Sequence, residues 1–131
     1  MDLSEKSKKE IGALGEDITC QYFKNRGFNV VGRNVARKTG EIDVIASRKN
    51  TLHFVEVKTI TCAEFPDPKV VSDDYDPSLN LHELKIRKVG RTAEWYVAEI
   101  DWKGEWQVDG FLVWLRLRDG LAKVLYLPQI V

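Results

Sequence analysis

The residues best suited to carry chemistry lie between Gly40 and Lys58. The chain there reads Gly-Glu-Ile-Asp-Val-Ile-Ala and, after a short polar connector, Leu-His-Phe-Val-Glu-Val-Lys. Asp43, Glu56 and Lys58 are thus placed in two otherwise hydrophobic segments. A buried charge is costly unless it is paired with an opposite charge or bound to a metal ion. These side chains therefore indicate a site, and they fit a divalent-metal site of the kind that hydrolyses phosphodiester bonds.

Strand geometry predicts how these groups meet. Glu56 and Lys58 are two residues apart, so they share a face of one strand, separated by roughly 7 Å. Glu41 and Asp43 share a face of the preceding strand for the same reason. If the hairpin brings these faces together, Asp43 and Glu56 converge with Lys58 beside them. Two carboxylates and a backbone carbonyl suit Mg²⁺, or Mn²⁺ in its place, because Mg²⁺ prefers oxygen ligands and keeps several waters.

A structural ion pair would explain the same residues without a metal. Lys58 could pair with Glu56 or Asp43 and hold the two strands together, since structural networks also bury charge. The Glu-x-Lys spacing is common by chance and does not separate the two interpretations. The additional acid on the neighbouring strand favours the metal site.

The elements that position these residues are predicted from periodicity and turn residues. Ser7 and Glu10 form a capping box that begins a helix near Lys8, and Arg26-Gly27 ends this helix. A second helix is expected to follow a cap at Asn80 and to run from Leu81 through Tyr96. The predicted strands are 28–34, 41–47, 52–60, 107–118 and 121–127, and the second and third of them form an antiparallel hairpin. Residues 61–79, which contain Pro66, Pro68 and Pro77, are predicted to form a long surface loop.

The whole chain is predicted to form a single domain, residues 1–131, because 131 residues is near the commonest domain size. Lys plus Arg and Asp plus Glu both number 20, so net charge does not favour nucleic acid as a partner. No apolar segment approaches membrane-spanning length, and the polar start carries no signal segment. Cys20 and Cys62 are the only cysteines, which favours a reducing, cytoplasmic location.

The motif around the acidic pair resembles a known family. Gly40-Glu41-Ile42-Asp43-Val44-Ile45-Ala46, followed by Phe54-Val55-Glu56-Val57-Lys58, resembles the YraN-like uncharacterised bacterial proteins of the restriction-endonuclease-like (PD-(D/E)xK) superfamily. The archaeal Holliday-junction resolvases are similar in motif order, though more distantly. The resemblance covers most of the chain, and further matches are Gly12-x-x-Gly15-Glu16, Arg33-Asn34, Lys85, Lys88, Ala93 and Val108-Asp109.

This resemblance implies a fold and a site. The fold is an α/β, restriction-endonuclease-like domain with a mixed central sheet flanked by helices, here in the order α-β-β-β-α-β-β. Asp43 and Glu56 are implied as metal ligands, Lys58 as the catalytic lysine, and Glu16 as an additional acid from the first helix. Without the resemblance, a solvated helix carboxylate is the preferred interpretation of Glu16. The implied activity is a Mg²⁺-dependent nuclease acting on DNA, with branched or flapped structures as candidate substrates.

Basic and aromatic residues could contact nucleic acid. Phosphate contacts are predicted for two clusters, and a solvated surface is an equal alternative for each. These clusters are Lys85, Arg87, Lys88 and Arg91 on the second helix, and Arg33, Arg37 and Lys38 before the acidic strand. Trp95, Trp102 and Trp106 could stack on unpaired bases, but core and rim packing is the expected role. His53 is expected to be packed and His82 to face solvent.

Two other functions fit the same sequence. Neutral charge and the acidic 61–79 segment favour a catalytically silent nucleic-acid-binding protein that keeps the nuclease fold. A protein-interaction module is the third hypothesis, because residues 111–117 carry apolar side chains on both faces of a strand. That strand is expected either to be sandwiched within the chain or to lie at a subunit contact. A homodimer is suggested by the resemblance to the resolvases.

Overall fold

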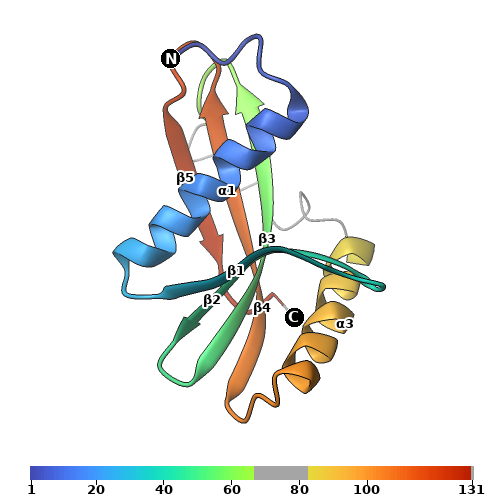
Figure 1. The fold of residues 1–131 in the computed structure, drawn as a ribbon. Helices are drawn as coiled ribbons and strands as arrows, with labels where there is room; N and C mark the ends of the chain where they lie inside the picture. The colour runs from blue at the N-terminus through green and yellow to red at the C-terminus, as the bar shows by residue number, and fades with distance from the viewer. Residues whose placement is uncertain (67–82, 131) are drawn as a thin grey trace.

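The computed structural model describes residues 1–66 and 83–130, and side chains are described outside residues 83–86. Two helices flank one five-stranded sheet (Figure 1). The elements in chain order are α1 (Lys8–Asn25), β1 (Asn29–Arg37), β2 (Gly40–Arg48), β3 (Thr51–Cys62), α3 (Glu83–Glu99), β4 (Glu105–Arg116) and β5 (Ala122–Leu127). The predicted α/β class and the order α-β-β-β-α-β-β are confirmed.

The sheet is mixed, with the strand order β1-β2-β3-β4-β5. β1–β2, β2–β3 and β4–β5 are antiparallel, whereas β3 and β4 are parallel. Because parallel neighbours need a crossover connection, the segment between β3 and β4 must return along the sheet, and α3 lies in that segment. The predicted hairpin of the second and third strands is confirmed.

The helix α1 begins at the predicted capping box. The Ser7 hydroxyl accepts a hydrogen bond from the Glu10 backbone N–H, and the Glu10 carboxylate accepts one from the Ser7 N–H, each at 3.1 Å. These reciprocal bonds satisfy backbone donors that have no partner within the helix. α1 then lies across one face of the sheet (Figure 1), and Ile11 and Phe23 are buried there.

Two hydrophobic clusters fill the two faces of the sheet. The cluster beneath α1 includes Val55 and Val57 of β3, and the cluster beneath α3 includes Leu52 and Phe54. This alternation along β3 follows from the two-residue period of a strand. β4 is buried along residues 108–115, so its two apolar faces are sandwiched within the chain. The first of the two expected roles for this strand is therefore the one observed.

The β1–β2 ribbon twists away from the other strands and reaches α3 (Figure 1). At its tip the hydroxyls of Thr39 and Thr92 are 2.7 Å apart and share a hydrogen bond. Gly40, with φ +148°, lies close to the Cβ atom of Lys88. β1 consequently extends to Arg37, beyond the predicted end at Asn34, because its end pairs with the start of β2.

β2 and β3 separate at the position of the candidate site. Their pairing runs from Arg48↔Thr51 to Val44↔Val55 and stops there, although both strands continue. Beyond that point the edge of β3 that faces β2 is open, while its other edge stays paired to β4 as far as Cys62. A sheet that opens between two strands exposes backbone groups and side chains from both of its faces.

Some predictions concern residues that the structure does not describe. Most of the predicted 61–79 loop lies outside the described residues, as do Asn80, the predicted cap, and His82, which was expected to face solvent.

Both cysteines are free, with Cys20 buried and Cys62 partly buried. In the described regions, neither helix has the combination of length and apolar character needed to cross a bilayer.

Candidate metal centre and its surroundings

A cavity of about 680 Å³ lies where β2 and β3 separate. Glu16 of α1, Asp43 of β2 and Lys58 of β3 all line it. The structure therefore brings together three of the four predicted catalytic side chains from three different elements. The remaining lining residues are Leu3, Ser4, Lys6, Lys8, Ile11, Gly12, Val57, Thr59, Thr61 and Leu117.

Asp43 lies at the open edge of β3. Its Oδ2 atom accepts a hydrogen bond from the backbone N–H of Val57, with 2.8 Å between the two heavy atoms. A strand N–H points sideways in the plane of its sheet, so this carboxylate occupies the gap between β2 and β3. The side chain is 9% exposed and reaches the cavity. Ile42 packs in the cluster beneath α3 and Val44 in the cluster beneath α1. Residues two apart in a regular strand share a face, so the change of face shows that β2 is irregular at Asp43.

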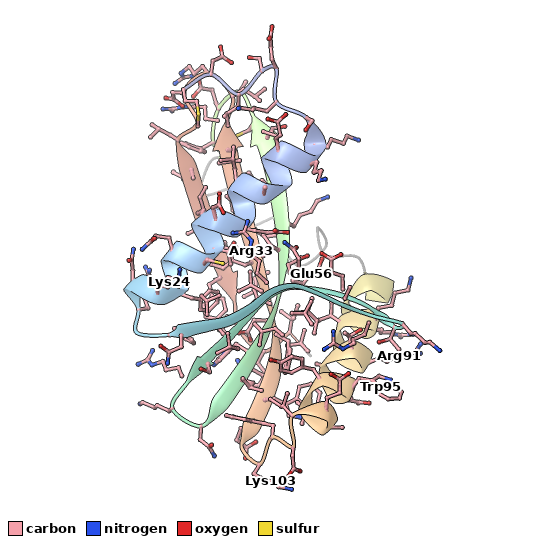
Figure 2. The ribbon with its side chains drawn as sticks, in the orientation of Figure 1. Lys24, Arg33, Glu56, Arg91, Trp95 and Lys103 are labelled. Atoms are coloured by element: carbon pink, nitrogen blue, oxygen red, sulfur yellow. The ribbon has the colours of Figure 1, made fainter. Side chains whose placement is uncertain are left out.

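Glu56 lies beside the cavity but is not among the residues that line it. It is 2% exposed, in the middle of β3, and Figure 2 labels it where the β1–β2 ribbon crosses that strand. The hydrogen bond to Val57 N places the Asp43 carboxylate against the peptide bond that joins Glu56 to Val57. The Asp43 carboxylate is thus next to the backbone of Glu56. By strand alternation, Glu56 shares the face of Phe54, and Lys58 follows on the same face.

Glu16, on α1, is the other acid that lines the cavity. Burial raises the pKa of its carboxyl group, and the negative charge of Asp43 raises it further. Hydrogen bonds from Asn34 and Arg33, together with the Arg33 charge, oppose this rise without cancelling it. The Nε atom of Arg33 lies 3.5 Å from the Glu16 carboxylate. Glu16 is therefore not the solvated helix carboxylate that its sequence position alone favoured, because its side chain is only 17% exposed and lines the cavity with Asp43.

The closeness of α1 to β3 depends on a glycine. A Cβ atom at Gly15 would collide with the Oγ1 atom of Thr59, whereas one at Gly12 would meet nothing within 4 Å. Gly15 therefore lets the helix lie against the strand, and Gly12 leaves room over the cavity that it lines. This contact carries Glu16, the residue next to Gly15, to the edge of the sheet.

The donor set suits a hard divalent cation. Asp43 and Glu56 offer carboxylate oxygens, and the repulsion between Asp43 and Glu16 is of the kind that a bound cation would relieve. Within residues 1–66 and 83–130, no group of three or more His, Cys, Asp or Glu side chains could hold a metal ion. An ion at Asp43 and Glu56 would therefore have to keep water molecules as its other ligands, as Mg²⁺ commonly does.

The predicted nucleic-acid contacts divide into two groups. Arg33 is engaged by α1, with 2.6 Å between its Nη1 atom and Asp17 Oδ1, and it lies beside that helix in Figure 2. Arg37 forms two hydrogen bonds of 2.9 Å with Glu99. Both of these arginines are exposed, and so are Lys38, Arg87, Lys88 and Arg91. Lys85 belongs to α3, but its side chain lies outside the described residues.

The tryptophans do not share one environment. Trp102 and Trp106 pack against the cluster beneath α3, as expected. The expectation of core or rim packing is wrong for Trp95, which is 60% exposed on the outer side of α3. The next residue, Tyr96, is also aromatic and does pack inward. The aromatic character of Trp95 therefore did not indicate that this position of the helix is exposed.

Two features of the structure, the lysines of the cavity and the contacts of Asp109, were not predicted from the sequence. Lys6 and Lys8 border the acidic cavity, although they lie far from the motif in the sequence. On the face beneath α1, the buried carboxylate of Asp109 accepts hydrogen bonds from the side chains of Tyr126 and Gln107, and its Oδ2 atom lies 2.7 Å from His53 Nδ1. The packed role predicted for His53 is confirmed, and its partner comes from β4.

The fold and this site describe an α/β protein with an acidic cavity at a divergence between two strands, and comparison with known sequences gives its family. The chain belongs to the uncharacterised protein family UPF0102, whose model matches residues 15–113. A UPF0102 protein of Campylobacter jejuni is 36% identical over 98 residues, which cover 75% of this chain and 78% of the relative. A UPF0102 protein of Caldanaerobacter subterraneus is 36% identical over 97 residues, covering 74% of this chain and 72% of the relative. One from Helicobacter pylori is 31% identical over 102 residues, covering 78% of this chain and 79% of the relative.

Proposed function

We propose that this protein is a divalent-metal-dependent nuclease of the restriction-endonuclease-like superfamily that hydrolyses phosphodiester bonds of DNA. The observation that carries the proposal is the cavity in which Glu16, Asp43 and Lys58 meet from three elements. The order of the elements and the Asp-(x)n-Glu-x-Lys arrangement on β2 and β3 support it. Branched or flapped DNA is the proposed substrate, as the resemblance implies.

Each side chain has a role in this proposal. Asp43 and Glu56 would hold Mg²⁺ or Mn²⁺, which supplies charge stabilisation at the phosphate and lowers the pKa of bound water. Lys58, exposed at the cavity, orients the attacking water or neutralises charge that develops on the phosphate. Glu16 adds negative charge beside Asp43 and accepts a proton more readily than an ordinary glutamate because its pKa is raised.

The border of the cavity suits a phosphate backbone. Lys6, Lys8 and Lys58 line the cavity together with the acids, and Lys6 also lies 3.7 Å from the Glu10 carboxylate. Lysine contacts to phosphate give affinity without base preference. Acidic and basic side chains therefore line one cavity, and in this proposal the acids bind the metal while the lysines contact the phosphates.

The test is a cleavage assay with the purified chain. Labelled duplex, four-way junction, flap and single-stranded DNA, with RNA counterparts, are incubated with Mg²⁺, Mn²⁺ or a chelator. Wild type is expected to cut at least one DNA structure in the presence of metal only, and Asp43→Asn and Lys58→Ala are expected to lose that cutting. Absence of cutting on every substrate, or equal cutting by Asp43→Asn, would overturn the proposal.

A catalytically silent binding module is the second candidate, and specific observations favour it. Glu56 does not line the cavity, and the described residues hold no cluster of three acids suited to a metal. Arg33 and Arg37 are already paired with carboxylates, and the formal net charge of the chain is zero. Salt-dependent DNA binding by wild type without cutting, retained in Lys58→Ala, would support this candidate over the nuclease.

A homodimer remains a proposal that rests on the resemblance to resolvases. The apolar strand that motivated it in the sequence is β4, which is covered within the chain. Light scattering at two protein concentrations, with and without a DNA junction, tests it. A monomer throughout removes the proposal.

A further inference from the structure

Trp95 lines a second cavity, which shares none of its described lining residues with the acidic cavity. This cavity measures about 450 Å³ and lies between α3 and the tip of the β1–β2 ribbon. Arg37, Lys38 and Thr39 line it from the ribbon, and Trp95 and Glu99 line it from the helix. An indole that is 60% exposed at the mouth of a cavity is available to a partner.

The walls of this cavity are held in place by hydrogen bonds. The Arg37 guanidinium binds both oxygens of Glu99 at 2.9 Å, and it also donates to the Ala36 carbonyl at 2.8 Å. The hydrogen bond between Thr39 and Thr92 fixes the ribbon tip on α3. A two-pronged arginine–carboxylate contact keeps the guanidinium plane in one orientation. Two flat groups, an indole and a guanidinium, thus line one preformed cavity.

Positive charge surrounds these flat groups. Lys38 is an exposed lining residue, and Lys88 and Arg91 are exposed on α3. Arg91 is one helical turn before Trp95, so the two side chains lie on the same side of the helix, and Figure 2 shows both of them pointing outward. The Arg37 charge is offset by Glu99, whereas the described contacts of Lys38 and Arg91 include no carboxylate.

We propose that this cavity binds an unpaired nucleotide of a single-stranded DNA segment. The base stacks on Trp95, with the Arg37 guanidinium as a second flat surface, and the flanking phosphates contact Lys38 and Arg91. Aromatic stacking together with a basic groove is the usual means of binding single strands without sequence preference. A duplex would be excluded from such stacking, because its bases are already stacked on each other.

This inference rests on the proposed function only for the choice of nucleic acid as ligand, and it gives that function a substrate class. A flap or a branched structure carries unpaired nucleotides next to a duplex. A cavity for an unpaired nucleotide would therefore select such substrates over plain duplex DNA. The acidic cavity and this one would then act on the same molecule.

Fluorescence anisotropy with the full chain in a chelating buffer tests the site without any cleavage. The probe is a labelled oligothymidylate of about 10 nucleotides, within the range that single-strand sites cover. Trp95→Ala is expected to weaken binding about tenfold, whereas Trp95→Phe keeps an aromatic ring and most of the affinity. Leu121→Ala, which shortens an exposed apolar side chain in the connection between β4 and β5, is the matched control and should bind as wild type does. Equal binding by Trp95→Ala and wild type overturns the proposal.

An abasic oligonucleotide of the same length separates stacking from charge. Its binding is expected to be weaker and to be insensitive to Trp95→Ala, since it offers phosphates without bases. Lys38→Ala and Arg91→Ala should each reduce the dependence of log K on log salt by about one ion. Lys24→Ala and Lys103→Ala, on exposed residues that Figure 2 places elsewhere, are the matched controls. If the control variants change the slope of log K against log salt as much as Lys38→Ala does, this result also contradicts the site.

The two proposals fail separately. Binding of the oligonucleotide that depends on Trp95, with no cutting of any substrate, removes the nuclease and leaves this site in place. If cutting depends on Asp43 but Trp95→Ala binds the oligonucleotide as wild type does, the proposal of this site is overturned and the nuclease proposal stands. Failure of wild type to bind any single strand overturns the present inference whatever the cleavage assay gives.

Discussion

The backbone N–H of Val57 donates a hydrogen bond to the carboxylate of Asp43, with 2.8 Å between Val57 N and Asp43 Oδ2. Backbone pairing between β2 and β3 has already ended at Val44↔Val55. A side chain therefore takes the place that a strand carbonyl would otherwise fill. The same acid serves the fold, by satisfying a buried edge of β3, and the candidate site, by facing the cavity.

Asp43→Asn and Asp43→Leu should separate these two roles. Asparagine retains an oxygen that can accept from Val57, so the variant should unfold in urea close to wild type while losing any cleavage. Leucine removes the acceptor and leaves a buried donor unsatisfied, which costs about 1 to 3 kcal/mol. Urea unfolding at neutral pH measures both. Equal losses of stability for the two variants would contradict the structural role of the hydrogen bond.

Glu16→Gln should make the protein more stable at neutral pH. Burial and the Asp43 charge raise the pKa of Glu16 above its ordinary value of 4.5, so its ionised form is disfavoured in the folded state. The stability of wild type should therefore fall as pH rises through the raised folded pKa, and glutamine avoids this loss. The melting temperature of both proteins is measured from pH 4 to pH 8. Glu10→Gln is not a suitable control, because Glu10 caps α1. The matched control is Glu94→Gln, at an exposed glutamate of α3.

Divalent metal should stabilise the fold through Asp43. Any ligand that binds only the folded state at ten times its Kd contributes about 1.4 kcal/mol. For a chain of this size, that corresponds to a rise in Tm of about 5 °C. Thermal unfolding with Mn²⁺ and with a chelator measures the shift, and Asp43→Asn should lose most of it. The same shift in wild type and Asp43→Asn would place the metal elsewhere.

Gly15→Ala and Gly12→Ala should have opposite effects although both add one methyl group to α1. At Gly15 the new Cβ atom collides with Thr59, so overpacking should cost about 1 to 3 kcal/mol. At Gly12 the space is open, and the higher helix propensity of alanine should contribute about 1 kcal/mol of stability. Urea unfolding of both variants measures the difference. Adding Thr59→Ala to Gly15→Ala should recover part of the loss, and a lack of recovery would point to a different cause.

Asp109→Asn should destabilise the sheet. Burial by itself raises the pKa of Asp109, but hydrogen bonds from His53, Gln129, Tyr126 and Gln107 outweigh burial and lower it below its ordinary value of 3.8. The stabilisation is therefore present above pH 3.8 and is lost as pH falls through the lowered folded pKa. We expect the variant to lose about 2 kcal/mol at neutral pH, since a hydrogen-bonded buried charge is removed.

The comparison of Asp109→Asn with wild type is made by urea unfolding at pH 7 and at successively lower pH. The difference between the two proteins should be constant down to about pH 4 and should narrow as pH falls from 3.8 through the lowered folded pKa of Asp109. Exposed Glu94→Gln is again the matched control, with little change at pH 7. A difference that grows as pH falls would contradict the assigned direction of the pKa shift.

The sequence by itself determined the elements and the candidate acids. The capping box at Ser7 and Glu10 predicted the start of α1, and hydrophobic periodicity with turn residues predicted the five strands, because these signals act between residues close in the chain. The family followed from the motifs at the level of an uncharacterised family. Asp43, Glu56 and Lys58 stood out for a local reason as well, since charged residues in hydrophobic strands need partners.

Only the tertiary structure decided which groups meet. The end of pairing at Val44↔Val55, the bond from Val57 to Asp43 and the contact of Gly15 with Thr59 depend on how strands twist and helices pack. The same packing drew Lys6 and Lys8 to the acidic cavity, paired His53 with Asp109 and left Trp95 exposed. These contacts join residues far apart in sequence, and local propensity carries no information about which distant surfaces will face each other.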